Sequence, residues 1–105
     1  MQQLQSIEQF NELKDNGKTV FMFTAKWCPD CHVIDPHLDE LQEQYKDYVW
    51  VSVDRDQFID LCIDQGIFGI PSFIAFDRGE EVGRFVSKDR KTKEEVQTFM
   101  NGLPS

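Results

Sequence analysis

Two cysteines three residues apart, Cys28 and Cys31, constrain this chain of 105 residues more than any other feature. They follow a nearly continuous apolar run over residues 19–24, and a long pattern of helical periodicity begins at the pair. Unpaired N–H groups at a helix N-terminus stabilise a thiolate, lowering the pKa of a cysteine placed there from about 8.5 to roughly 3.5–7.5. Cys28 is therefore the candidate nucleophile. Cys31, one helical turn farther on, lies close enough to form a disulfide with it.

Three further features lie at defined distances from this pair. Pro36 lies inside the helical pattern, eight residues after Cys28; residues 69–72 read Gly-Ile-Pro-Ser; and residues 76–80 have the pattern of a hairpin turn. With these features the chain resembles the thioredoxin family over about its whole length. The resemblance implies an α/β thioredoxin fold, with a mixed four- or five-stranded central sheet flanked by helices on both faces. It also implies one thioredoxin-like domain over residues 1–105.

Apolar periodicity, turn residues and capping patterns predict a compatible order of elements from the residues alone. The first half is expected to hold a short edge strand within 1–5, a helix opened by Ser6, a strand over 19–24, a helix from about Cys28 to Tyr45 and a strand over 49–53. The second half is expected to hold a helix that Asp54 or Asp56 caps and Gly66 ends, strands over 72–76 and 81–86, and a helix opened by Thr92. The strand–helix–strand unit in the middle predicts a right-handed crossover between parallel strands. The apolar stripes place Ile7 and Val33 on buried helix faces.

Composition and charge exclude several classes of partner and cellular location for this protein. The net charge of −8 makes nucleic acid and anionic membranes poor partners, and no apolar run approaches the roughly 20 residues that a membrane span needs. Residues 1–5 have neither a basic nor an apolar signal-peptide region, so a cytoplasmic location is predicted. Three cysteines, an odd number, do not suggest a disulfide framework, and a Cys-x-x-Cys pair in the cytosol indicates redox chemistry.

The resemblance assigns roles to residues around the cysteines. It implies that the Ile70–Pro71 peptide bond is cis and lies opposite the cysteine pair, where neighbouring backbone can bind an extended substrate. Trp27 is expected on the same substrate-binding surface. Pro29 and Asp30, between the cysteines, are expected to tune the acidity of the first thiol.

The chain departs from its family at two positions. Thioredoxins usually carry a buried aspartate beneath the cysteines and a lysine that pairs with it; the corresponding residues here are Met22 and Trp50. The internal groups that handle the proton in the family are therefore expected to be missing.

Several residues allow two interpretations. Cys28, Cys31, His32 and His37 offer soft ligands, but structural zinc needs four that converge, and His37 lies beyond Pro36. No metal site is therefore predicted, although an iron–sulfur cluster shared between two chains is a remoter alternative.

Two apolar positions are open as well. Cys62 is interpreted as a small core residue, with a regulatory thiol as the alternative. Phe68 fits an apolar rim and the core equally well.

The sequence thus predicts a cytosolic thiol–disulfide oxidoreductase that acts mainly as a disulfide reductase through Cys28 and Cys31. The dithiol is the whole reagent, so no bound cofactor is expected. The expected partners are disulfide-containing proteins or small-molecule disulfides and a thioredoxin-reductase-like electron donor, with the chain itself a monomer. The alternative is a thioredoxin-like adaptor that binds partners with little or no turnover.

Overall fold

A mixed sheet with the strand order β1-β3-β2-β4-β5 organises the computed structural model, which describes residues 1–104. The strands are β1 (Gln2–Gln3), β2 (Lys18–Thr24), β3 (Val49–Asp54), β4 (Ser72–Asp77) and β5 (Glu80–Phe85). β1, β3 and β2 run parallel, whereas β4 is antiparallel to β2 and β5 is antiparallel to β4. The structure confirms the predicted thioredoxin fold, in its five-stranded form.

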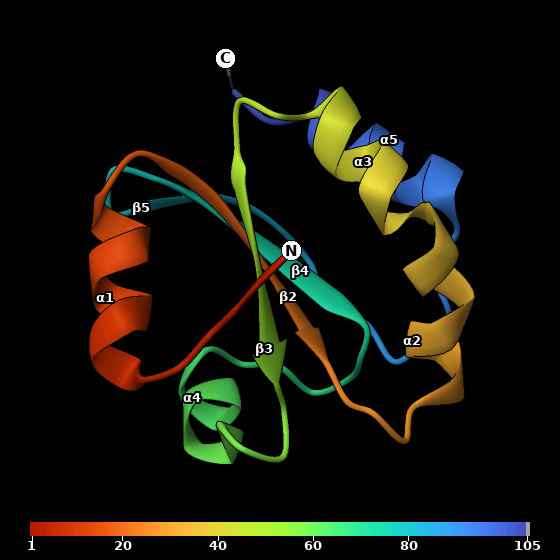
Figure 1. Cartoon of the computed structure of the whole chain (residues 1–105), viewed down its shortest axis with the longest axis horizontal. Coiled ribbons are helices and arrows are strands. Elements are labelled where there is room, and N and C mark those ends of the chain that lie inside the picture. The colour runs from red at the N-terminus through yellow and green to blue at the C-terminus, as the bar shows by residue number, and fades with distance from the viewer. Residues whose placement is uncertain (105) are drawn as a thin grey trace.

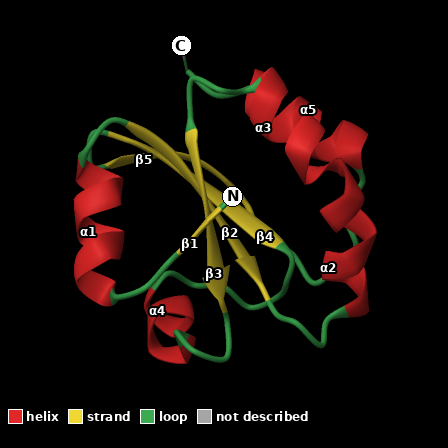
Figure 2. Cartoon of the chain, in the orientation of Figure 1, coloured by secondary structure: helices red, strands yellow, loops and turns green. Residues whose placement is uncertain are grey.

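The helices cover both faces of this sheet (Figure 1; Figure 2). They are α1 (Ile7–Asp15), α2 (Pro29–Ile34), α3 (Leu38–Gln44), α4 (Ile59–Asp64) and α5 (Lys93–Asn101). One layer holds α1 and α4, and the other holds α2, α3 and α5. Residues 19–23 of the central strand β2 are fully buried, or nearly so, because both layers pack on it. A strand buried on both faces accounts for its continuous apolar run.

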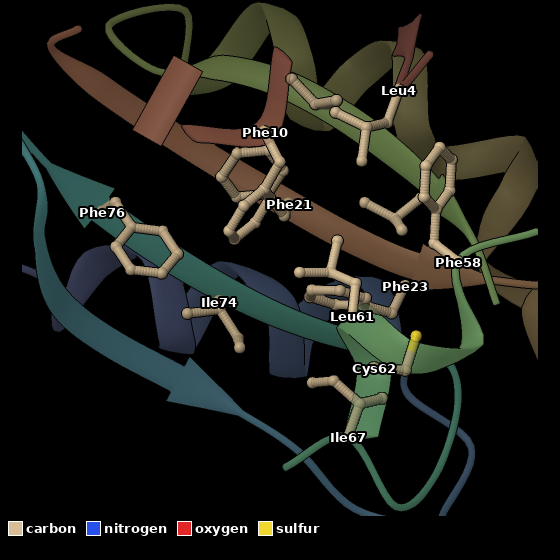
Figure 3. Close-up of a cluster of buried hydrophobic side chains, with 12 residues drawn as sticks. Leu4, Phe10, Phe21, Phe23, Phe58, Leu61, Cys62, Ile67, Ile74 and Phe76 are labelled. Carbon is tan, nitrogen blue, oxygen red and sulfur yellow. The ribbon is translucent and has the colours of Figure 1, made fainter. Parts of the chain in front are cut away.

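Each layer closes its own hydrophobic core. Figure 3 shows the core beneath α1 and α4, where Phe10, Phe21 and Phe76 contact one another; the Phe10 and Phe21 ring centroids lie 4.6 Å apart. Cys62 lies in this cluster, as predicted for a small core residue. The opposite core is made of Val20, Met22, Ile34, Leu41, Trp50, Phe73, Ala75, Val96 and Met100.

The predicted long helix after Cys28 is interrupted. Residues Asp35–His37 form a 3₁₀ turn between α2 and α3, at the position of Pro36. A proline inside a helix removes an N–H donor and clashes with the preceding turn, so an interruption is expected there. The predicted burial of Ile7 and Val33 is wrong: they are 47% and 40% exposed, because their helices are short and only one stripe of each meets the sheet.

The predicted cap of the third helix by Asp54 or Asp56 is wrong: Phe58 precedes α4 without a side-chain cap, and the Asp54 carboxylate accepts from the backbone N–H groups of Asp56 and Gln57 in the turn before it. The predicted caps at Ser6 and Thr92 and the predicted turn are confirmed. The Ser6 hydroxyl accepts from the backbone of Gln9 at the start of α1, and Thr92 forms a capping box with Glu95 at the start of α5. Arg78 and Gly79 connect β4 to β5 with φ values of 51° and 91°. Positive φ at both central residues is the geometry that joins two antiparallel strands without splaying them.

Candidate active site

Strand directions bring three chain segments to one edge of the sheet. β2 ends there at Thr24, beside Asp54 of the parallel strand β3. Because β4 is antiparallel to β2, its first residue, Ser72, lies at the same edge opposite Phe23. The cysteine pair follows β2, and Pro71 directly precedes β4. Residues far apart in sequence therefore meet at this edge.

Cys28 is the N-cap of α2, as predicted. Its sulfur accepts a hydrogen bond from the backbone N–H of Cys31 at 3.3 Å. Pro29 occupies the first helical turn, where its missing N–H costs no helical hydrogen bond. The Cys28 thiol also donates toward the backbone carbonyl of Ile70, with a sulfur–oxygen distance of 3.9 Å. The Cys28 sulfur thus lies between the backbone N–H of Cys31 and the loop before β4.

Cys31 lies behind Cys28 and is fully buried, whereas Cys28 keeps 4% of its surface exposed. Burial raises the pKa of the Cys31 thiol to about 11, and its hydrogen bond with Cys28 acts in the same direction. Hydrogen bonds with the Thr24 side chain and the Ala25 backbone lower it less. Burial likewise raises the pKa of the Cys62 thiol to about 11. Both thiols are therefore protonated at neutral pH, and all three cysteines are free in this structure.

This arrangement predicts which thiol reacts first. When the reduced protein is treated with iodoacetamide between pH 6 and 8, the label should appear on Cys28, because thiolates are the reactive species and the raised pKa values keep Cys31 and Cys62 protonated. Cys31 and Cys62 should be labelled only as the pH approaches about 11. Peptide mapping by mass spectrometry across a pH series measures this order. Labelling of Cys31 or Cys62 ahead of Cys28 at pH 6–7 would contradict it.

The Ile70–Pro71 peptide bond is cis, as the family resemblance implied. Pro71 is buried, and Ile70 packs against Ala25, Cys28 and Cys31. The neighbouring Gly69 approaches another loop so closely that an added Cβ would lie 2.6 Å from the Cα of Lys88. The loop before β4 is thus fixed between the cysteine pair on one side and the β5–α5 connection on the other.

Trp27 presents a large apolar surface beside the cysteines and is 58% exposed. Its indole N–H donates to the Asp56 carboxylate at 2.7 Å, and the Arg55 guanidinium lies 5.8 Å from its ring centroid. Phe68 is 63% exposed, which decides between the two interpretations of this residue in favour of the surface. The ring of Trp27 is therefore held in place from the loop after β3 while staying open to a partner.

Asp30 has a partner that sequence analysis missed. Its carboxylate lies 3.4 Å from Nε of Arg90, and the two side chains are 36% and 64% exposed, respectively. Arg90 lies 60 positions farther along the chain, inside a run of charged residues that would ordinarily be interpreted as a solvated loop. The positive charge of Arg90 therefore partly offsets the negative charge that Asp30 places near the cysteines.

Lys91, the next residue, was also missed. It is 1% exposed, and its ammonium donates to the Ser87 carbonyl, the Ser87 hydroxyl and the Asp89 carbonyl at 3.0–3.4 Å. The ammonium also lies 5.0 Å from the ring centroid of Phe85. Burial lowers the pKa of Lys91. Lysine is almost never fully buried unless it is paired, so the sequence gives no sign that Lys91 is buried.

The positions of the missing acid and lysine are apolar in space as well as in sequence. Met22 is 1% exposed and Trp50 is 4% exposed, and both lie in the core beneath α2 and α3. A cleft of about 280 Å³ reaches this region; Met22, Thr24, His32 and Asp35 are among its lining residues. Thr24, whose hydrogen bond lowers the pKa of Cys31, is one of these lining residues.

His32 lies at the surface, and both of its ring nitrogens have partners. One nitrogen lies 2.7 Å from the Lys26 carbonyl and the other 3.1 Å from the Asp35 carboxylate. These two hydrogen bonds, the first being stronger, raise the pKa of His32. Within residues 1–104, no three His, Cys, Asp or Glu side chains gather as metal ligands. None of the helices described over the same range is long and apolar enough to cross a membrane.

Comparisons with known proteins agree with this architecture. A family model described as Thioredoxin matches residues 2–102. An H-type thioredoxin of Fagopyrum esculentum is 36% identical over 80 residues, which cover 75% of this chain and 69% of the relative. Mitochondrial thioredoxin-2 of Schizosaccharomyces pombe is 29% identical over 96 residues, covering 88% and 72%. The crystal structure of a Malassezia sympodialis thioredoxin has a TM-score of 0.83 at 23% identity, covering 97% and 91% of the two chains.

A thioredoxin fold with two cysteines, separated by two residues, at the start of α2 defines a thiol–disulfide oxidoreductase. The match of the family model over nearly the whole chain, with a relative above 30% identity, makes the assignment specific. This chain belongs to the thioredoxin family.

Proposed function

We propose that the protein is a cytosolic disulfide reductase in which Cys28 attacks the substrate and Cys31 resolves the intermediate. The observation that carries the proposal is the placement of the Cys28 sulfur between the Cys31 N–H and the Ile70 carbonyl, with Cys31 buried behind it. The outer sulfur is reachable and lies at a helix N-terminus. The inner sulfur is protected until the outer one has reacted.

The reaction proceeds in two exchanges. The Cys28 thiolate attacks one sulfur of a substrate disulfide; the substrate S–S bond breaks, and the departing thiolate takes up a proton. Cys31 then loses its proton and attacks the Cys28 sulfur, and the second substrate thiol leaves. The substrate gains two electrons and two protons, while a Cys28–Cys31 disulfide forms. A thioredoxin-reductase-like enzyme, or a small thiol, returns the two electrons.

The proton on Cys31 must leave before the second exchange. A hydrogen bond with the Thr24 side chain lowers the pKa of Cys31, and Thr24 lines the cleft described above. Water in the cleft takes the role that a buried carboxylate has elsewhere in the family. Substrate binding falls to Trp27, Ile70 and Pro71, where an extended segment of the partner can pair with backbone beside the cis-proline.

Pro29 and Asp30 tune the first step. Asp30→Asn removes a negative charge next to the cysteines and leaves Arg90 in place, so both effects favour the Cys28 thiolate. We expect attack on a disulfide at pH 6 to become about two- to fivefold faster, the size of an exposed charge interaction. Stopped-flow measurement of the first exchange tests this prediction. Asp47→Asn, an equal charge change at an exposed residue preceding β3, should leave the rate unchanged; a slower Asp30→Asn enzyme would refute the tuning role.

The alternative is an adaptor that binds partners through Trp27, Ile70 and Pro71 but turns over poorly. The apolar residues at Met22 and Trp50 favour it, because they remove the family's proton-handling pair. Reduction of a protein disulfide in the presence of an electron donor separates the two functions. Sustained turnover that requires Cys28 supports the reductase, whereas stoichiometric binding without turnover supports the adaptor.

The setting of this activity is also a proposal. We assign the protein to the cytosol as a monomer, with residues 1–105 acting as one domain and no resident cofactor. Three free cysteines are compatible with a reducing compartment. The mitochondrial relative makes that organelle the competing location. Cell fractionation distinguishes the two compartments, and light scattering on the purified protein gives its oligomeric state.

A further inference from the structure

The connection between β5 and α5, residues 86–92, reaches the active site from a direction that the sequence does not suggest. β5 is antiparallel to β4 and ends at Phe85, which pairs with Phe73 close to the cis-proline. The chain then passes beside α2 before α5 begins (Figure 1). Two contacts fix its position: Ser87 and Lys88 lie against Gly69, and Arg90 pairs with Asp30. This loop therefore borders both halves of the site.

The loop is internally braced, so its side chains have defined directions. The buried Lys91 ammonium holds the Ser87 carbonyl, the Ser87 hydroxyl and the Asp89 carbonyl, and the Asp89 N–H donates to the Ser87 hydroxyl. With Lys91 pointing inward, Lys88 and Arg90 remain exposed. An ammonium with three acceptors costs less to bury than an unpaired one, and it stabilises the loop only in this conformation.

The exposed cations differ from their surroundings. The chain carries a net charge of −8, yet residues 88–91 contain the exposed cations Lys88 and Arg90 and the buried Lys91 beside a single acidic residue. Arg90 meets Asp30 through Nε alone, and its terminal guanidinium nitrogens make no hydrogen bond within the described residues. Guanidinium presents several donors in a fork that matches a carboxylate. A second carboxylate can thus bind Arg90 without displacing Asp30.

We propose that Lys88 and Arg90 make the enzyme prefer polypeptide disulfides with an Asp or Glu within two or three residues of the attacked cysteine. The inference rests on the proposed reductase function and names a substrate class for it. Only 4% of the Cys28 surface is exposed, so a substrate must approach closely, which brings residues flanking its cysteine to the rim formed by Lys88 and Arg90. An acidic flank meets the positive charges of Lys88 and Arg90 at this rim, although the chain as a whole carries a net charge of −8.

The test uses symmetric disulfides of one short peptide with Glu, Gln or Lys on both sides of its single cysteine, so that either sulfur is equivalent. The rate of reduction by the reduced protein is divided by the rate with dithiothreitol, which removes differences in intrinsic disulfide reactivity. We expect a Glu-to-Gln ratio of about two to five, the range of exposed ion pairs, and a Lys-to-Gln ratio below one. High salt should bring both ratios toward one.

Variants assign the preference to the rim. Arg90→Gln, and more strongly Lys88→Gln/Arg90→Gln, should move the Glu-to-Gln ratio toward one, although Arg90→Gln also affects Asp30 and can slow all peptides equally. Lys46→Gln is the matched control: Lys46 is exposed, has a long ion pair with Glu43 and precedes the amino end of β3, at the far edge of the sheet. It should retain the wild-type ratio.

The outcomes separate this inference from the proposed function. Failure to reduce even the Gln peptide would overturn the reductase function itself. Reduction with a Glu-to-Gln ratio of one or less, or an unchanged ratio in the double variant, would overturn only the charge preference. Loss of the ratio in Lys46→Gln would assign it to net charge instead of the rim. If Arg90 accelerated reduction of the disulfide of 3-mercaptopropionic acid more than reduction of the Glu peptide disulfide, the choice of a polypeptide substrate would be overturned.

Discussion

Cys31→Ser should convert the enzyme into a trap that holds its substrates through a disulfide to Cys28. Cys31 is fully buried behind Cys28, with its backbone N–H on the Cys28 sulfur, so no other described thiol is placed to displace the bound substrate. Serine fits the site but cannot attack a disulfide at a useful rate. Turnover should fall by at least about 100-fold, because the two residues act as one catalytic unit.

The trap is measured on non-reducing gels. Partners should co-migrate with Cys31→Ser and disappear from that position after reduction, and Cys28→Ser should trap nothing. Cys62→Ala is the matched control, because Cys62 is equally buried but lies in the core beneath α1 and α4; it should keep its turnover and trap nothing. Equal trapping by Cys28→Ser, or trapping that depends on Cys62, would refute the assigned roles.

Gly69→Ala should damage the active site without touching a cysteine. The backbone of Gly69 leaves no space for a side chain, since an added Cβ would lie 2.6 Å from the Cα of Lys88 and even closer to the Ser87 carbonyl. The obstacle is backbone, which cannot rotate away as a flexible side chain can. Overpacking of this kind costs about 1–3 kcal/mol, and displacement of the loop before Pro71 should lower kcat/KM by about 10- to 100-fold.

Thermal unfolding and reduction kinetics measure the two effects together. A loss of 1 kcal/mol lowers Tm by about 4–8 °C in a protein of this size. Gly102→Ala is the matched control, because Gly102 ends α5 with an ordinary φ of −84° and its nearest neighbour would lie 3.5 Å from a new Cβ. It should change Tm little and leave kcat/KM unchanged. Wild-type activity in Gly69→Ala would show that the contact between the two loops does not position the site.

The sequence by itself determined the order of the elements and the chemistry of the cysteine pair. The strand β2 could be predicted from its apolar run, because a strand covered on both faces has no polar side. The caps at Ser6 and Thr92 could be predicted because their hydrogen-bond partners lie only three residues away. The place of Cys28 at a helix start is equally local. Local rules act over one or two helical turns, so they predicted these features from neighbouring residues.

Which apolar residues are buried was harder to predict than the order of the helices and strands. Val33 and Ile7 belong to apolar stripes but face solvent, since the width of the buried stripe depends on how far each short helix leans on the sheet. Phe68 was undecided between rim and core, and only the path of the chain after α4 placed it at the surface. These residues obey the same hydrophobic preference; what differs is whether another layer reaches them.

The tertiary structure alone decided what surrounds the cysteines. The pairing of Arg90 with Asp30 and the close approach of Gly69 to Lys88 join segments that only the antiparallel β4–β5 hairpin brings to the edge where β2 ends. Lys91 is buried because three oxygen atoms of its own loop satisfy its ammonium, which a run of charged residues gives no reason to expect. Contacts of this kind depend on strand order and loop path. Local sequence patterns therefore identify the cysteine pair, whereas the loops that pack around it follow only from the tertiary structure.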